Sequence, residues 1–205
     1  MIPFPTAKPE RLAEPTWEIA HLFPDQGAWS EEEYLALETN HLVEFSHGHI
    51  EVLPMPTQNH QFIVFFLMRF LQEFLISRHG GTVLQAPFRV QLWPGKYREP
   101  DVSLMLPEHD DRRFEEFWDG ADLVIEVVSG SAKDRERDLV TKRREYATAG
   151  ILEYWIVDPK LETVTVLQLV NDGYTEHGTF KRGETVTSYL FPELAIPAER
   201  ILAGK

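Results

Sequence analysis

The longest apolar segment of the chain lies at residues 60–77. Its sequence, HQFIVFFLMRFLQEFLIS, contains neither glycine nor proline and carries few charges. An apolar run of this length favours a largely buried helix over a strand. The His-Gly-Gly sequence at 79–81 is predicted to end the helix, because glycine readily adopts the backbone conformation that follows a helix.

Four β-like runs follow this segment, near residues 82–92, 101–106, 122–128 and 152–158. A polar helix is predicted over about 134–149, between the last two runs, and Gly150 is a suitable end for it. Strands that alternate with helices in this way pack as a sheet covered by helices. We therefore predict that the four runs lie in one mixed sheet, flanked by helices near 60–77 and 134–149.

Two β-hairpins are predicted outside these runs. The sequence HLVEFSHGHIEVLP contains two short β-prone stretches around Gly48. Farther along, TVTVLQLV at 163–170 and YTEHGTF at 174–180 flank an Asn-Asp-Gly turn. The second hairpin is expected to be attached to the sheet.

The chain is predicted to be a flexible arm, residues 1–16, followed by a single domain of the α/β (α+β) class, residues 17–205. Four prolines interrupt any regular period in the arm. A short helix is predicted to start near Glu31, because Ser30 can cap it and its first turn is acidic. No repeat or Gly/Ser-rich linker divides the remainder.

Composition excludes several classes of protein. The 205-residue chain is 43% hydrophobic, which is enough for one sizeable core, and it has no cysteine. Disulfides and thiolate metal sites are therefore excluded, and a reducing compartment, most simply the cytoplasm, is expected. The longest unbroken apolar run, Phe62 to Met68, is far short of the roughly 20 residues that span a bilayer, so no membrane association is expected.

The net charge of −13 argues against a broad positively charged surface that would bind the phosphates of a nucleic acid. A local basic strip such as Lys142-Arg143-Arg144 can nevertheless coexist with an acidic remainder. Nucleotide-binding, P-loop and α/β-hydrolase motifs are absent from the sequence, as are the HxH and HExxH spacings of histidine-rich zinc sites.

Two carboxylates stand out against this background. Glu126 interrupts the apolar run DLVIEVVS, where an unpaired charge is costly, so either a structural partner or a functional site must compensate for it. Asp101 follows Glu99-Pro100 at the start of another β-like run, although a plain turn aspartate would look the same. Two acids on consecutive strands can hold one hard cation, and we expect their carboxylates to lie close enough to share it.

The next helix carries four polar residues at a spacing of four: Asp134, Asp138, Lys142 and Tyr146. They lie roughly along one helix face, where solvated pairing is the common alternative to function. His60, at the start of the long helix, and Glu44, in the first hairpin, could approach the same end of the sheet. A cap or a surface position is the ordinary alternative for such a histidine.

These residues resemble the Uma-two family of restriction endonucleases, within the PD-(D/E)XK nuclease superfamily. The matching text is EPDVSLM at 99–105, DLVIEVVSGSAKDRERDLVTKRREYATAGILEYWIVDP at 122–159, and the segments WSEEEYLAL and VEFSHGHIEVLPMPTQNH. Together they span about residues 29–190. Gly130 departs from the family pattern, which commonly has proline there.

The resemblance implies a restriction-endonuclease-like αβββαβ core with Asp101 and Glu126 as its acids. The superfamily usually places a lysine two residues after the second acid, where this chain has Val128. The family pattern instead implies a migrated lysine on the next helix, which matches Lys142. Its ammonium is then expected to point into the same cleft as the two carboxylates.

The implied activity is metal-dependent cleavage of nucleic acid, with DNA as the expected partner. Asp101, Glu126 and the carbonyl of Val127 would bind Mg²⁺ or Mn²⁺, and Lys142 would orient water or stabilise charge on the phosphate. Glu44, His60, Asp138 and Tyr146 are auxiliary candidates. A Lys142→Ala variant is expected to keep its fold and metal binding while losing cleavage.

Three alternatives stay open at this point. One is a non-catalytic nucleic-acid-binding or assembly module, which the charge of −13 favours. Another is hydrolysis of a small phosphate ester. The third concerns assembly: the strand containing Tyr154 and Trp155 could be the edge of a homodimer, although core packing is the more ordinary role for such aromatic residues.

Overall fold

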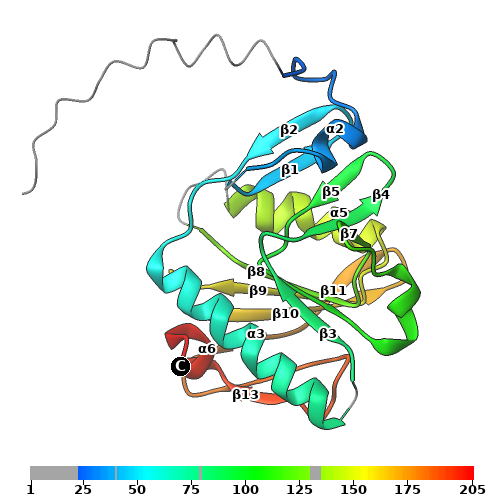
Figure 1. Ribbon diagram of the computed structural model, residues 1–205. Helices are drawn as coiled ribbons and strands as arrows, with labels where there is room; N and C mark the ends of the chain where they lie inside the picture. The colour runs from blue at the N-terminus through cyan, green and yellow to red at the C-terminus, as the bar shows by residue number, and fades with distance from the viewer. Residues whose placement is uncertain (1–22, 40, 79, 130–134) are drawn as a thin grey trace, which may run out of the picture.

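The computed structural model describes residues 23–39, 41–78, 80–129 and 135–205 (Figure 1). The predicted flexible arm, residues 1–16, lies outside the described residues, as does Asp134. Within the described ranges, no helix is both long enough and apolar enough to cross a lipid bilayer.

A mixed six-stranded sheet forms the centre of the molecule, with the strand order β11-β10-β9-β8-β6-β3. Its strands are β3 (Thr82–Gln85), β6 (Val102–Met105), β8 (Leu123–Val127), β9 (Glu153–Asp158), β10 (Thr163–Val170) and β11 (Gly173–Lys181). Strands β8 and β9 pair in parallel, and every other neighbouring pair is antiparallel. The strands predicted from the runs at 101–106, 122–128 and 152–158 are thus confirmed as members of one mixed sheet.

The run at 82–92 does not form one strand, so the prediction that all of it lies in this sheet is wrong. Its first part is β3, but its second part is β4 (Arg89–Trp93), which belongs to a different sheet. Pro87 lies between them and has no backbone N–H to donate to a strand ladder. The chain therefore leaves the central sheet after Gln85.

The second sheet has five strands in the order β2-β1-β5-β4-β7. Besides β4 it contains β1 (Val43–Ser46), β2 (His49–Val52), β5 (Lys96–Arg98) and β7 (Phe117–Asp119). Strands β1 and β2 are the predicted hairpin around Gly48. Glycine is required at this turn, because its φ is +83° and an added Cβ would lie 2.5 Å from the carbonyl oxygen of Gly27.

The predicted helices occur with small differences in extent. Helix α2 (Glu31–Leu35) begins with a capping box, in which Ser30 Oγ accepts from the backbone N–H of Glu33 at 3.1 Å and the Glu33 carboxylate accepts from that of Ser30 at 2.8 Å. Helix α3 (Gln58–Arg78) is the long apolar segment. Helix α5 (Lys142–Thr148) is preceded by one turn of π-helix, η2 (Arg137–Thr141).

The remaining elements are a second hairpin and several short segments. Strands β10 and β11 form the second predicted hairpin. The other elements are η1 (Pro107–Arg112), β12 (Thr185–Thr187), β13 (Ala195–Pro197) and α6 (Ala198–Ala203). Strands β12 and β13 make a small separate sheet.

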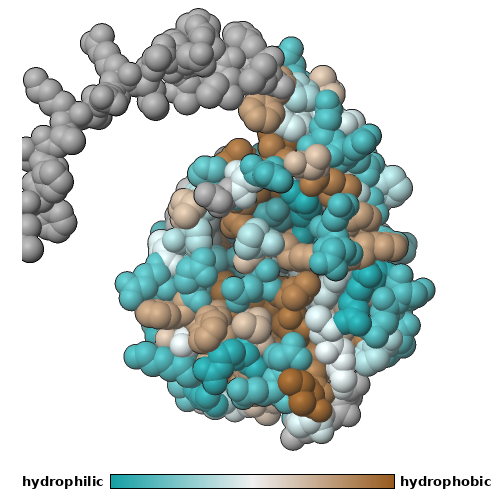
Figure 2. Space-filling view, viewed as in Figure 1, coloured by the Kyte–Doolittle hydropathy of each residue, from teal (hydrophilic) through white to brown (hydrophobic). Residues whose placement is uncertain are grey.

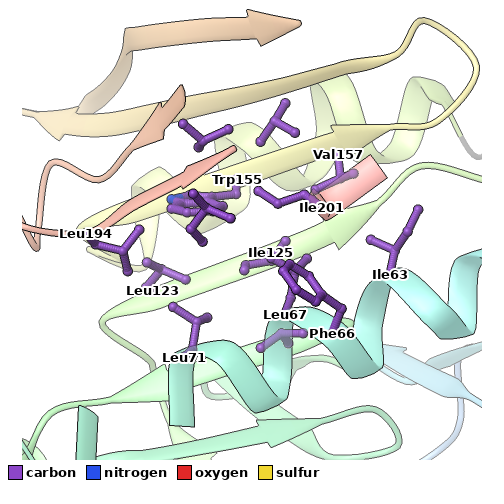
Figure 3. Packing of buried hydrophobic residues seen from close by; sticks show 14 of the residues in the cluster. Ile63, Phe66, Leu67, Leu71, Leu123, Ile125, Trp155, Val157, Leu194 and Ile201 are labelled. Carbon is purple, nitrogen blue, oxygen red and sulfur yellow. The ribbon is translucent and has the colours of Figure 1, made fainter. Parts of the chain in front are cut away.

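The central sheet separates two hydrophobic layers. One face packs on α3, where Ile63, Leu67 and Leu71 meet Ile125 and other side chains of the sheet (Figure 3). The opposite face packs on α5 and its neighbours, through a second buried cluster that includes Tyr146 and Tyr154. Tyr154 and Trp155 are both completely buried in the monomer, which assigns them to core packing.

Strand alternation decides which layer each residue of β8 enters. Leu123, Ile125 and Val127 belong to the α3 cluster, while Val124 and Val128 belong to the α5 cluster. Because successive side chains point to opposite faces of a sheet, Glu126 must project toward α5. Strand β8 therefore presents one carboxylate to an otherwise apolar layer.

Two neighbouring positions on α3 provide a test of this packing. Leu75 is fully buried in the core, whereas Ile76 is 74% exposed. We expect Leu75→Ala to lower the free energy of unfolding by about 2–5 kcal/mol, because it removes buried methyl groups and leaves a cavity. The matched Ile76→Ala variant should change it by less than about 0.5 kcal/mol. Urea unfolding followed by tryptophan fluorescence measures both, and equal losses would contradict the burial assignment.

Candidate active site

Asp101 and Glu126 lie opposite each other at one end of the antiparallel pair formed by β6 and β8. Val102 pairs with Ile125 in that ladder, so the next position places Asp101 across from Glu126. Side chains directly opposite in an antiparallel pair project from the same face. The backbone N–H of Val127 donates to Asp101 Oδ2 at 2.7 Å and fixes that carboxylate against β8.

Both carboxylates line a cavity of about 350 Å³. Lys142, His60, Asp138 and Glu99 contribute to the same lining, together with Val127. These residues come from α3, β8, the η2–α5 helix and the segment before β6. The cavity thus collects polar side chains from segments far apart in the sequence.

The ammonium of Lys142 is the centre of this group. Its Nζ lies 2.8 Å from Glu126 Oε1, 3.1 Å from Glu44 Oε1 and 3.7 Å from Asp138 Oδ1. The residue is only 1% exposed. The solvent-facing lysine that was the alternative for this position is therefore not what the structure contains.

The π-helical turn keeps three of the predicted polar residues on one face. In an α-helix, residues four apart are displaced by roughly 40° around the axis. The backbone N–H of Lys142 donates to the carbonyl of Arg137, five residues earlier, so this turn is wider than an α-helical turn and offsets the displacement. Asp138, Lys142 and Tyr146 are consequently all buried on the side facing Glu126.

The auxiliary candidates also lie at this site. Tyr146 donates from its hydroxyl to Glu126 Oε1 at 2.5 Å. His60 Nε2 lies 3.2 Å from Asp101 Oδ2, and His60 Nδ1 is buried with no hydrogen-bond partner among the described residues. Glu44, in β1 of the second sheet, contacts Lys142 as described above.

A second layer of buried charges supports Glu44. Arg98 in β5 donates to Glu44 and also to Glu145 of α5, whose carboxylate lies 2.8 Å from the Arg98 Nε and 2.7 Å from its Nη2. Lys96 Nζ lies 2.8 Å from the other oxygen of Glu145. This network joins the second sheet to α5 directly behind Lys142.

The sequence did not predict roles for Arg98, Glu145 and Lys96, because the partner of each residue is distant along the chain. The only signal available was that two cations stand in a short β-prone stretch, KYR, that turns out to be entirely buried. Glu99 was noted only as the neighbour of Pro100. It is buried, and it accepts a hydrogen bond from the backbone N–H of Val43 at 3.0 Å.

The expected basic strip at residues 142–144 does not exist as one surface. Lys142 is buried in the cavity, while Arg143 and Arg144 are exposed. Arg143 donates to the carbonyl of Tyr174 on β11. Three consecutive residues of a helix point in different directions, so their charges cannot act together.

Burial and ion pairing oppose each other in setting the proton affinity of these groups. Burial raises the pKa of Glu126, although Lys142 counteracts it, and burial likewise raises the pKa of Asp138. For Glu44, burial is outweighed by Lys142 and Arg98, which lower its pKa to about 2. Burial raises the pKa of Glu99 to about 7.

The donor set fits a hard divalent cation. Mg²⁺ is commonly bound through one or two carboxylates, with the remaining positions taken by water or phosphate oxygens. Asp101 and Glu126 supply two carboxylates on one face of the sheet, at the edge of a cavity. Among the described residues, no group of three or more Asp, Glu, His or Cys side chains is arranged to hold a metal. Such a cation would therefore need oxygen atoms from elsewhere.

Comparisons with known proteins agree with the fold and with the resemblance seen in the sequence. A family model, Uma2, described as "Putative restriction endonuclease", matches residues 31–199. The fold is similar to the crystal structure of a protein described as "a putative nuclease belonging to DUF820" from Anabaena variabilis ATCC 29413. The TM-score is 0.68 at 19% sequence identity, over 84% of this chain and 97% of that chain. No curated protein matches the chain.

Removing Lys142 should destabilise the protein, which changes the expectation that a Lys142→Ala variant simply keeps its fold. A Lys142→Met variant would leave three buried carboxylates without their shared cation, and breaking a buried pair typically costs about 3–5 kcal/mol. The loss should shrink as pH falls from about 7 toward 5. Burial raises the pKa of Glu126 and of Asp138 and Lys142 lowers it in the wild type, so removal of Lys142 raises both pKa values further in the folded variant. The folded variant then takes up protons before the unfolded chain does and regains stability relative to the wild type as pH falls.

Urea unfolding of wild type and variant at several pH values measures this difference. Lys181→Met, at an exposed position, is the matched control and should unfold like the wild type at each pH. A deficit for Lys142→Met that stays constant with pH would contradict the proposed role of the carboxylates.

Proposed function

Since the chain belongs to the Uma2 family of restriction-endonuclease-like proteins, we propose that it is a nuclease that hydrolyses phosphodiester bonds of DNA with the help of Mg²⁺ or Mn²⁺. One observation carries the proposal. Two carboxylates and one ammonium, Asp101, Glu126 and Lys142, line a single cavity although they come from three separate elements. Structural ion pairs rarely require a cavity beside them, whereas a reacting phosphate does.

The positions of the charges in the cavity support the need for a bound divalent cation. Four carboxylates line the cavity, those of Glu99, Asp101, Glu126 and Asp138, and four cationic side chains line it as well, those of Arg135, Arg137, Lys142 and Lys160. Lys142 is already shared by Glu126 and Asp138, so a phosphate placed directly beside Asp101 and Glu126 would be repelled by them unless a further positive charge were bound there. A divalent cation bound by Asp101 and Glu126 would polarise the phosphate and lower the pKa of a bound water molecule.

The protein's own residues hold these groups in position. Val127 N–H and His60 each contact Asp101 Oδ2. Tyr146 and Lys142 both contact Glu126 Oε1. With these contacts in place, the other oxygen of each carboxylate is the one left to face the cavity. Preorganised groups of this kind need little rearrangement when the reaction occurs.

Lys142 has a second task in the proposed reaction. Water attacks the phosphorus atom, the bond between phosphorus and the leaving sugar oxygen breaks, and that oxygen takes up a proton. Negative charge builds on the phosphate oxygens during attack, and the Lys142 ammonium stabilises it. Because Glu44 also holds the ammonium, Lys142 keeps a partner when Glu126 engages another cation.

A non-catalytic nucleic-acid-binding module is the second candidate. The net charge of −13 favours it, because a chain this acidic lacks the general affinity for DNA that nucleases commonly show. The complete set of two acids and a lysine opposes it. Such a module would have no need for a recessed group of carboxylates that weakens phosphate binding.

Substituting the acids tests cation binding and cleavage together. We expect Asp101→Asn and Glu126→Gln to abolish Mn²⁺-dependent cleavage and to remove most Mn²⁺ binding measured by isothermal titration calorimetry, because each variant removes half of the carboxylate donors. Glu116→Gln, at an exposed site outside the cavity, should behave like the wild type. The assay uses DNA and RNA side by side. Mn²⁺ binding by the wild type without cleavage of either polymer would favour the non-catalytic module.

Substituting the lysine separates catalysis from cation binding. Lys142→Met should keep Mn²⁺ binding and lose about 10²–10³-fold in cleavage rate, since it removes one preorganised charge from the transition state. Measurements belong at a temperature where the variant is folded, as judged by circular dichroism. Unchanged cleavage would remove Lys142 from the mechanism, while Lys181→Met provides the control for loss of a positive charge.

A further inference from the structure

We infer that the cavity takes one unstacked nucleotide, so that the substrate is single-stranded DNA rather than an intact duplex. The inference rests on the proposed function and specifies its substrate. It is drawn from the depth of the site, the chemistry of its walls and the distribution of charge.

The reacting groups lie below the protein surface. Asp101 is 8% exposed, Glu126 4% and Lys142 1%. A phosphate that reaches them must enter the cavity. In a duplex, the bases on both sides of a phosphate stay stacked and paired, and pulling out one nucleotide costs a few kcal/mol. A single strand bends into such a recess without that cost.

One part of the cavity wall is apolar. It is formed by Leu42 together with the segment 53–57, Leu-Pro-Met-Pro-Thr, which connects β2 to α3. Met55 is 72% exposed there, although it has no polar group to solvate. A flipped or single-stranded base has lost its stacking neighbours. Apolar side chains beside the catalytic centre can cover its flat face in their place.

A different part of the wall carries positive charge. Arg135 and Lys160 line the cavity, and Arg135 is held by Asp158 at 2.7 Å. Lys160 is exposed, and no ion pair involving it occurs among the described residues. These two cations can accept the phosphates next to the scissile one. They attract phosphate locally, whereas the chain as a whole, with a net charge of −13, does not.

The volume agrees with one nucleotide. A cavity of about 350 Å³ lies at the lower end of the range of roughly 300–1,000 Å³ that holds small-molecule ligands. The apolar wall would take the base, the cationic wall the flanking phosphates, and the carboxylate floor the reacting phosphate with its cation. No basic surface large enough to follow a duplex is needed in this arrangement.

The test compares binding and cleavage of a fluorescein-labelled oligonucleotide, alone and annealed to its complement. Binding is followed by fluorescence anisotropy in Ca²⁺, with gel electrophoresis to show that the strand stays intact, and cleavage is followed in Mn²⁺. We expect the single strand to bind and to be cut at least about tenfold better than the duplex, given that base stacking contributes about 1–3 kcal/mol per base.

Variants of Met55 assign the effect to the apolar wall. Met55→Trp should raise single-strand affinity several-fold by offering a stacking surface, a gain that misfolding cannot imitate. Met55→Glu should lower it about tenfold. Ile76→Glu is the matched control: it adds the same charge at an equally exposed position on α3 outside the cavity and should leave binding unchanged.

The outcomes distinguish this inference from the proposed function. Duplex cleaved as fast as single strand, or Met55 variants without effect on binding, would overturn the single-strand inference while the nuclease proposal stood. Single-strand binding with the expected Met55 pattern, but no cleavage in Mn²⁺, would overturn the nuclease proposal and leave this inference intact.

Discussion

The buried ammonium of Lys142 is the interaction on which the rest of the structure depends. Removing a charge from water costs several kcal/mol even after the protein relaxes, and good partners must offset this cost. Here three carboxylates do so, from β1, β8 and the π-helical turn before α5. Their positions fix how the helix crosses the sheet, because Lys142 can meet Glu126 only if α5 packs over the end of β8.

The same constraint explains why the second sheet belongs to the site. Glu44 stands on β1 and is held by Arg98 of β5, which in turn is held by Glu145 of α5. The buried charges therefore form a closed path from the central sheet through Lys142 to the second sheet and back to α5. Removing one member would take a partner from at least one other buried charge, so the two sheets and the helix hold their relative positions as a unit.

The sequence predicted most of the elements and the two acids, because these signals are local. Helix α3 and both hairpins follow from length, period and turn residues, and Glu126 is visible as a charge inside an apolar run. The division of residues 82–92 between two sheets was missed, although Pro87 marks the break. Spacing marked Lys142 as one of four polar residues along a helix face, but its role beside the two acids came from the family resemblance, since the same spacing also fits a solvated face. Arg98 and Glu145 were beyond reach, because pairs of buried charges 47 residues apart leave no periodic pattern.

The structure shows how the charges of this acidic chain are distributed between its surface and the cavity. Polar side chains cover much of the visible face (Figure 2), whereas the cavity is lined by four cationic and four acidic side chains. An acidic surface repels nucleic acid over distances of about the Debye length, roughly 8–10 Å at physiological salt, so it would discourage random contact with a duplex. Inside the cavity, the carboxylates of Asp101 and Glu126 repel each other, and a divalent cation bound between them would relieve that repulsion. In the proposed mechanism, the acidity that weakens general binding is therefore also what makes the site dependent on its cation. The reacting phosphate would be held at the point where the cation, Lys142 and the recess coincide.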